Sequence, residues 1–262
     1  DEAMGEITGQ GSMLGLDVNQ TGEADFTRFT MGNRAELQMN MQELVLGDTG
    51  GGSDVDVDNL SLGHIARTDG TQFDGKSYSA NDIVPFVGLD PYLELAEDNG
   101  NVVGFRMGFT ESRGTLSGKF QSLTGRLGIE LEDSNGNVED GQLLQSDGTA
   151  NNQRATHFGL EGSNTACSSQ VDCAPLSAIQ TLEVGDRDTD GNAVFTNDFF
   201  ISFQNQALEW QSPGDGSGTV STDSGVFMNI PTAMRLDLQQ LQNDTVVPRK
   251  RTEFIDRGKG LF

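Results

Sequence analysis

Basic residues are scarce in this sequence. It holds 16 Lys and Arg against 40 Asp and Glu, a formal net charge of −24 at pH 7. A surface this acidic repels phosphate backbones and anionic lipid head groups, which argues against nucleic acid as a partner. Long apolar runs are missing as well, and none approaches the roughly 20 residues that a membrane span needs. We therefore expect no membrane span.

Motifs of known catalytic chemistry are also missing. The sequence contains no GxSxG, HExxH or phosphate-binding loop pattern, and its two histidines, His64 and His157, stand outside any nucleophile setting. Paired carboxylates are frequent only because acidic residues are frequent, so they do not indicate glycosidase chemistry. We expect that the protein is not an enzyme.

Cysteine is limited to Cys167 and Cys173. The chain begins at Asp1 and not at a Met, from which we expect that a signal peptide has been removed and that the protein is exported. An even number of cysteines at close spacing in an exported protein predicts one local disulfide. The rival interpretation is a metal-binding pair, which lacks further Cys ligands.

Glycine, in contrast, is abundant. The 34 glycines and an apolar fraction of 34% are typical of a β protein with many turns. Residues 101–133 predict a run of short strands separated by Gly-containing turns, with Val103, Phe105, Met107 and Phe109 alternating. The predicted fold class is all-β, with bent antiparallel sheets in a sandwich or a flattened prism, and with an extended N-terminal segment.

Two segments share one pattern in which strict alternation is interrupted. Residues 39–47 read MNMQELVLG and residues 55–63 read VDVDNLSLG. In each segment two adjacent polar residues stand directly before a final Leu-x-Leu-Gly. Apolar residues before and after such an insert point the same way only if one residue is bulged out. The intervening GDTGGGSD predicts a reversal and hence an antiparallel pair. We predict Met39 opposite Leu62, Gln42 opposite Asn59 and Glu43 opposite Asp58, so that both strands break at the same level.

The two ends of the chain differ in charge and are expected to lie outside the main domain. We assign residues 1–20 to an N-terminal extension that is a candidate intersubunit strand, residues 21–247 to one β domain, and residues 248–262 to a basic tail. The last 15 residues carry five basic and two acidic side chains, so this end can dock on the next acidic subunit. Frayed, solvated termini are the alternative. The candidate intersubunit residues are Met4, Ile7, Met13, Leu14, Leu16, Arg249, Lys250 and Arg251.

One acidic cluster has the spacing of a calcium loop. Asp186, Asp188 and Asp190 alternate and are followed by Gly191, which is the front half of the calcium-loop pattern. Asn197 stands where a bidentate Glu would complete it. We favour a plain acidic turn, keep calcium as the one candidate metal, and expect no other cofactor.

Short motifs resemble a known family. The opening DEAMGEITGQG, the VDVDNLSLG motif and DPYLELA at residues 90–96 are similar to pilus-assembly (Fil-type fimbrial) proteins of Gram-negative bacteria. The resemblance spans the N-terminal half best, implies a fimbrial cell-surface location, and carries over no catalytic residues. We expect a structural subunit of an extracellular filament or pilus whose partners are copies of itself, joined by heterologous head-to-tail contacts and strand addition. The alternative is a calcium-dependent surface adhesin or a carbohydrate-binding module.

Overall fold

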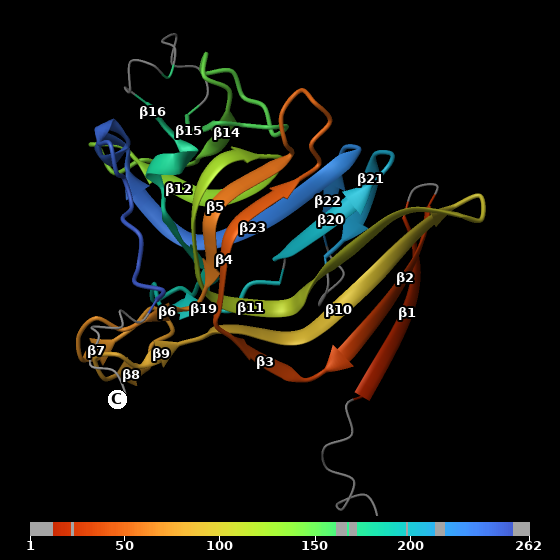
Figure 1. The fold of residues 1–262 in the computed structure, drawn as a ribbon, viewed down its shortest axis with the longest axis horizontal. Coiled ribbons are helices and arrows are strands. Elements are labelled where there is room, and N and C mark those ends of the chain that lie inside the picture. Colours follow the sequence, from red (N-terminus) through yellow and green to blue (C-terminus); the bar gives the residue numbers. More distant parts are fainter. Residues whose placement is uncertain are drawn as a thin grey trace, which may run out of the picture.

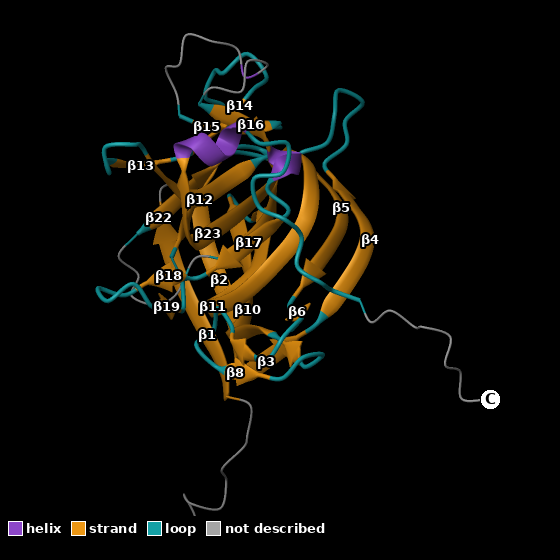
Figure 2. Ribbon diagram, turned by 90° about the vertical axis from the view of Figure 1, so that its left-hand side faces the viewer, coloured by secondary structure: helices purple, strands orange, loops and turns teal. Residues whose placement is uncertain are grey.

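The computed structural model describes residues 13–21, 24–160, 167, 172–197, 199–212 and 218–253. Regular structure in this part of the chain is almost entirely β-strand, and the helical segments are the 3-10 helices η3 (Leu176–Ala178) and η4 (Leu238–Gln242) (Figure 2). None of the helices found there is long and apolar enough to cross a membrane. The prediction of an all-β fold is confirmed.

Most strands belong to one large sheet of 12 strands. It contains β1 (Met13–Thr21), β2 (Ala24–Gly32), β3 (Arg34–Leu37), β4 (Met39–Leu46), β5 (Val55–Leu62), β10 (Phe86–Asp98), β11 (Asn101–Leu123), β12 (Gly125–Glu132), β13 (Val138–Asp140), β17 (Thr181–Val184), β20 (Phe200–Gln204) and β23 (Gly225–Asp237). Neighbours in this sheet pair antiparallel, except that β12 pairs parallel with β23. The path β1-β2-β10-β11-β17-β23-β12-β13 branches at β11, which also pairs with β5 and β20.

The remaining strands form small sheets around the large one. A three-stranded sheet contains β14 (Gln142–Leu144), β15 (His157–Gly159) and β16 (Cys173–Pro175). Two-stranded pairs are β6 (His64–Ile65) with β9 (Ile83–Val84), β7 (Gly70–Thr71) with β8 (Ser77–Tyr78), β18 (Asp186–Arg187) with β19 (Ala193–Val194), and β21 (Leu208–Gln211) with β22 (Thr219–Thr222).

Strand β11 is the central strand of the fold, because its 23 residues connect the part of the large sheet that contains β10 with the part that contains β5 and β17 (Figure 1). Residues before Gly114 pair with β10 and β20, and residues from Gly114 onward pair with β5 and β17. Gly114 has φ +152°, and a Cβ there would lie 2.7 Å from the Phe86 Cα, so only glycine fits at this crossing. The predicted short strands and Gly turns in residues 101–123 are therefore wrong: glycine here permits close packing within one long bent strand.

The hairpin of β4 and β5 has two of the three predicted residue pairs, and the register passes over Gln42 and Asn59. Met39 pairs with Leu62 and Glu43 pairs with Asp58, so the two polar inserts are neighbours. Asn59 lies between them in the left-handed region at φ 53°, and the register with β11 shifts by one residue at this level. Because Asn59 is bulged out, Val57 and Leu60 on either side of the break are both buried.

Two apolar clusters stabilise these strands. The main core lies among β5, β11, β12, β17 and β23, and includes Val55, Val57, Leu116, Phe120, Leu123, Ile129, Leu131, Leu182, Val184 and Ile230. A second cluster surrounds Trp210 of β21 and includes Phe26, Tyr92, Ala96, Phe200 and Phe227. The hairpin of β21 and β22 therefore covers one side of β2, β10 and β11.

The structure describes part of each predicted end segment. Residues 13–21 form β1, which pairs with β2 through nine consecutive residue pairs from Met13–Gly32 to Thr21–Ala24. The division of the chain into an extension, a domain and a tail stays a prediction. Residues 248–253 lie along the body, where the Thr252 carbonyl accepts a hydrogen bond of 2.8 Å from the Asn40 side chain. Residues 1–12 and 254–262 lie outside the described residues.

Candidate self-association surface

Strands β1, β2, β10 and residues 101–113 of β11 form a sheet that extends away from β4, β5 and β12 (Figure 1). We call this part the arm. One of its faces, the open face, carries apolar side chains that continue from strand to strand. In one row Leu16 lies opposite Phe29, followed by Leu93, Met107 and Ile201. A second row runs from Val18 through Thr27, Leu95 and Phe105 to Phe203.

The open face is uncovered over most of its width. The rows begin beside the core, since Ile201 and Phe203 of β20 still pack against it. Met107, Leu93 and Phe29 are 44%, 41% and 38% exposed, and exposure is highest on β1, at 69% for Leu14, 60% for Leu16 and 68% for Val18. A contiguous exposed apolar surface of this kind is typical of a protein interaction site.

The opposite face of the arm holds charged side chains that are buried. Glu94 of β10 lies between Arg28 of β2 and Arg106 of β11, and Arg28 Nε donates a hydrogen bond of 3.1 Å to Glu94 Oε1. Arg106 Nε donates to Glu94 Oε2. The exposed fractions of Arg106 and Glu94 are 0% and 1%. Two cations thus share one carboxylate in a site closed to water.

The hairpin of β21 and β22 closes this charged site. The Gln211 carbonyl accepts hydrogen bonds from both Arg28 and Arg106. The Arg106 guanidinium carbon also lies 5.1 Å from the centre of the Trp210 ring, a cation–π distance. The covered side of the arm thus holds these three charged residues beside the apolar cluster around Trp210, and the other side is left open.

Two of the predicted intersubunit residues belong to the open face. Leu14 and Leu16 point outward from β1, at the end of the large sheet. Met4 and Ile7 lie outside the described residues, as does the side chain of Met13. Val18, the third apolar residue in the alternation of β1, was not among the predicted residues, and this alternation could have found it. Phe29, Met31, Leu93 and Met107 were not predicted, because their segments carry apolar residues on both faces.

The predicted basic residues of the C-terminal region make contacts within their own chain. Arg249 Nη2 donates to Ser61 Oγ at 2.7 Å, Lys250 Nζ lies 3.3 Å from Glu183 Oε1, and the Arg251 carbonyl accepts from the Ile65 amide at 2.7 Å. They do not adjoin the arm strands in the sheet. Their role between subunits stays a prediction.

The predicted disulfide is present between Cys167 and Cys173. Both residues are buried and pack with Leu144 in a small cluster of their own. The bridge joins the segment at Cys167 to β16, and the Cys167 amide donates to the Ser146 carbonyl at 3.2 Å.

The acidic motif at residues 186–192 forms the turn between β18 and β19. Asp188 Oδ1 accepts hydrogen bonds from the backbone amides of Asp190 at 3.0 Å and Asn192 at 2.8 Å. The Asn192 side chain and amide together hold the pKa of Asp188 below its usual value. Gly191 at φ 81° closes the turn. Residues 133–137 repeat this arrangement, with Asp133 accepting from the Asn135 and Asn137 amides.

The turn geometry accounts for the Asp-x-Asp-Gly-Asn spacing without a cation. It uses an acceptor at the first position and a left-handed glycine at the fourth, features that a calcium loop shares. Within the described ranges, no three His, Cys, Asp or Glu side chains are grouped so that they could hold a metal ion.

The two histidines make hydrogen bonds within the fold, His157 with the Thr156 hydroxyl at 2.8 Å. His64 Nε2 donates to Gln72 Oε1 at 3.1 Å, which leaves Nδ1 to accept from the Thr115 hydroxyl at 3.0 Å. Burial lowers the pKa of His64 and that of His157. Both rings are therefore neutral structural partners at pH 7.

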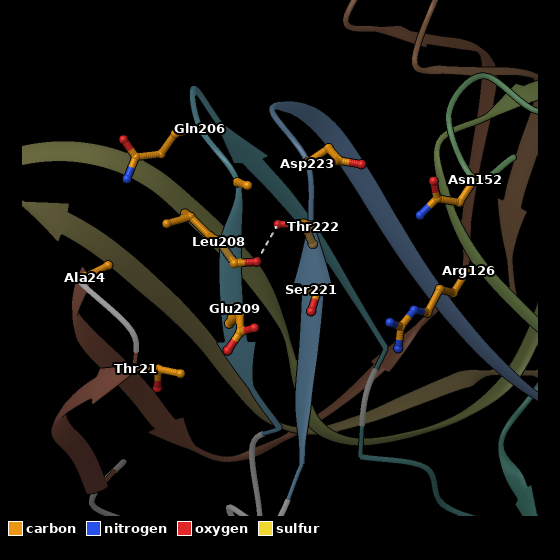
Figure 3. A pocket seen from close by; sticks show the side chains of 11 residues that line it. Thr21, Ala24, Arg126, Asn152, Gln206, Leu208, Glu209, Ser221, Thr222 and Asp223 are labelled. Atoms are coloured by element: carbon orange, nitrogen blue, oxygen red, sulfur yellow. Dashed lines mark hydrogen bonds between the residues drawn. The ribbon is translucent and has the colours of Figure 1, made fainter.

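A polar groove of about 460 Å³ lies beside the arm (Figure 3). Arg126 and Asn152 lie on one side of it, and Glu209 and Ser221 of the hairpin of β21 and β22 lie opposite. Its lining can form hydrogen bonds, but Trp210, the aromatic residue of this hairpin, is buried on the other side. The open face is therefore the more distinctive surface.

Comparison of the chain with models of known protein families, with curated proteins and with solved structures returns no match in any of the three. The resemblance to fimbrial assembly proteins thus rests on the short motifs alone and stays a prediction.

Proposed function

We propose that the protein is an exported structural subunit that self-associates through the arm and builds an extracellular filament, as the fimbrial resemblance implies. The observation that carries this proposal is the open face: an apolar surface over four strands that ends at β1, which among the described residues pairs only with β2. A site for small-molecule chemistry has a different form, in which a few polar groups converge in an enclosed pocket.

Charge distribution supports association of like subunits. A chain with a net charge of −24 repels its own copies. On the arm, however, Glu94 and both arginines are buried on the covered side, and the two apolar rows of the open face contain no charged residue, although Asp25 and Glu97 lie beside them. Two copies can therefore meet along these rows without opposing charged side chains.

The disulfide supports the exported location. Disulfides persist in oxidising compartments such as the periplasm and the cell surface, and are rare in the reducing cytosol. Cys167 and Cys173 are both buried, so the bridge is part of the folded structure.

The experiment compares assembly of the wild type with that of an arm variant. We replace Leu14, Leu16 and Val18 by Thr, which keeps strand propensity and removes apolar surface. Sedimentation velocity and negative-stain microscopy should show oligomers and filaments for the wild type and monomers for the variant, with unchanged circular dichroism. The matched control replaces Ile83 and Val138, two exposed apolar residues on strands away from the arm, and should assemble normally.

A wild-type protein that stays monomeric at every concentration would falsify the proposal. Equal assembly of the arm variant and the wild type would also exclude the arm as the contact.

A further inference from the structure

We propose that β1 pairs antiparallel with β1 of a second copy, with Leu16 on the two-fold axis. This inference rests on the proposed self-association and specifies the geometry of its first step. A two-fold contact by itself closes into a dimer, so growth of a filament from such dimers uses a second contact elsewhere on the subunit. Among the described residues, β1 pairs only with β2, so its outer edge presents a row of backbone donors and acceptors.

The edge of β1 lacks the features by which proteins protect edge strands. Such strands are usually short, or interrupted by a bulge, proline or lysine. β1 has nine residues, MLGLDVNQT, without Pro or Lys, and its register with β2 contains no shift. Asp17 is its one charged residue. A long, regular, weakly charged edge is suited to a further strand.

The side chains of β1 select a single register with its own copy. With Leu16 on the axis, Leu14 lies opposite Val18 of the second copy and Asp17 lies opposite Gly15. All three apolar residues then meet apolar partners, and the two carboxylates stay apart. A shift by one residue opposes the apolar face to the polar one.

The other registers that keep the faces aligned are less favourable. Centring the pair on Asp17 opposes two like charges, which is destabilising. Centring it on Val18 sets Leu16 opposite Gln20, and centring it on Gly15 leaves Val18 without a partner within β1, so each loses an apolar pair. This self-complementarity is why a second copy, and not an unrelated strand, is the occupant that we assign to the edge.

Cysteine crosslinking tests the register directly. Both native cysteines are joined in the disulfide, so an added cysteine is the one free thiol. Directly opposed residues have Cα atoms about 4.5–5.5 Å apart, within disulfide range. L16C should therefore form a covalent dimer under mild oxidation. In V18C the two sulfurs are offset by four residues, roughly 13 Å, and no dimer should form.

A mixture of two variants provides the decisive test. L14C alone and V18C alone should stay uncrosslinked, whereas an equimolar mixture should give the mixed dimer, identified by mass spectrometry. These side chains are exposed, so folding should be unchanged, and circular dichroism checks this. Assembly without the L16C crosslink, or with an equal yield for V18C, overturns the register while self-association stands. A wild type that remains monomeric overturns both proposals.

Discussion

Replacing Glu94 by Gln should destabilise the protein by about 3–5 kcal/mol, because it leaves the buried guanidinium groups of Arg28 and Arg106 without their counter-charge. Glu94 is 1% exposed, and each of its carboxylate oxygens accepts from one arginine. For a chain of this length such a loss lowers the melting temperature by roughly 6–20 °C. Unfolding in guanidinium chloride, followed by tryptophan fluorescence, measures the loss in free energy of unfolding, since Trp210 packs against Arg106.

The matched control is Glu130→Gln. Glu130 also binds an arginine, with Arg235 Nη2 at 2.7 Å, but both side chains are exposed. Such surface ion pairs contribute about 0.2–1 kcal/mol. If E94Q costs no more than E130Q, the reasoning about the buried charges is wrong. A triple change of Arg28, Glu94 and Arg106 to Met, Leu and Met should recover most of the lost stability, because no charge is left uncompensated.

Three further predictions concern other parts of the fold. Since the pKa values of His64 and His157 are lowered in the folded state, the unfolded chain binds more protons below pH 6.5. The free energy of unfolding should therefore be constant above pH 6.5 and fall as the pH decreases toward the folded-state pKa values. Denaturation curves at several pH values should show a smaller pH dependence of stability in H64Q. Converting Cys167 and Cys173 to Ala should cost about 2 kcal/mol and leave oligomer size unchanged by sedimentation, because the closed loop is short and peripheral; monomers would place the loop at the interface. In D188A, hydrogen exchange of the Asn192 amide should accelerate while that of Asn137 stays slow, and equal rates would exclude the capping role of Asp188.

The sequence was most informative where structure is local. The break in MNMQELVLG and VDVDNLSLG, with a glycine-rich reversal between, was sufficient to predict that Met39 faces Leu62. A hairpin register depends on neighbouring residues and on the turn, both of which are visible in one sequence.

The sequence was less informative about which face of a strand is buried. Leu93, Glu94 and Leu95 alternate so that the leucines would ordinarily face a core and the glutamate water. The structure buries Glu94 and exposes Leu93. Periodicity predicts which residues share a face of the strand, but not which of the two faces is buried. Here that depends on Arg28 and Arg106, which are distant in the chain but adjacent to Glu94 in the sheet.

Glycines within β11 were misinterpreted for a related reason. A glycine can mark a turn or a close approach of two segments, and only the tertiary partner distinguishes these. At Gly114 that partner is Phe86. The strand therefore continues through a position at which the sequence predicts a reversal.

The closure of the arm by Gln211 has a consequence for how this protein can evolve. The hydrogen bonds and ion pairs that hold β2, β10 and β11 together lie on the side beneath β21 and β22. If the arm associates as proposed, substitutions on the other side would change which surface it contacts without removing these interactions. Association and folding would then be inherited through separate sets of residues, and the partner could change while the same scaffold is kept.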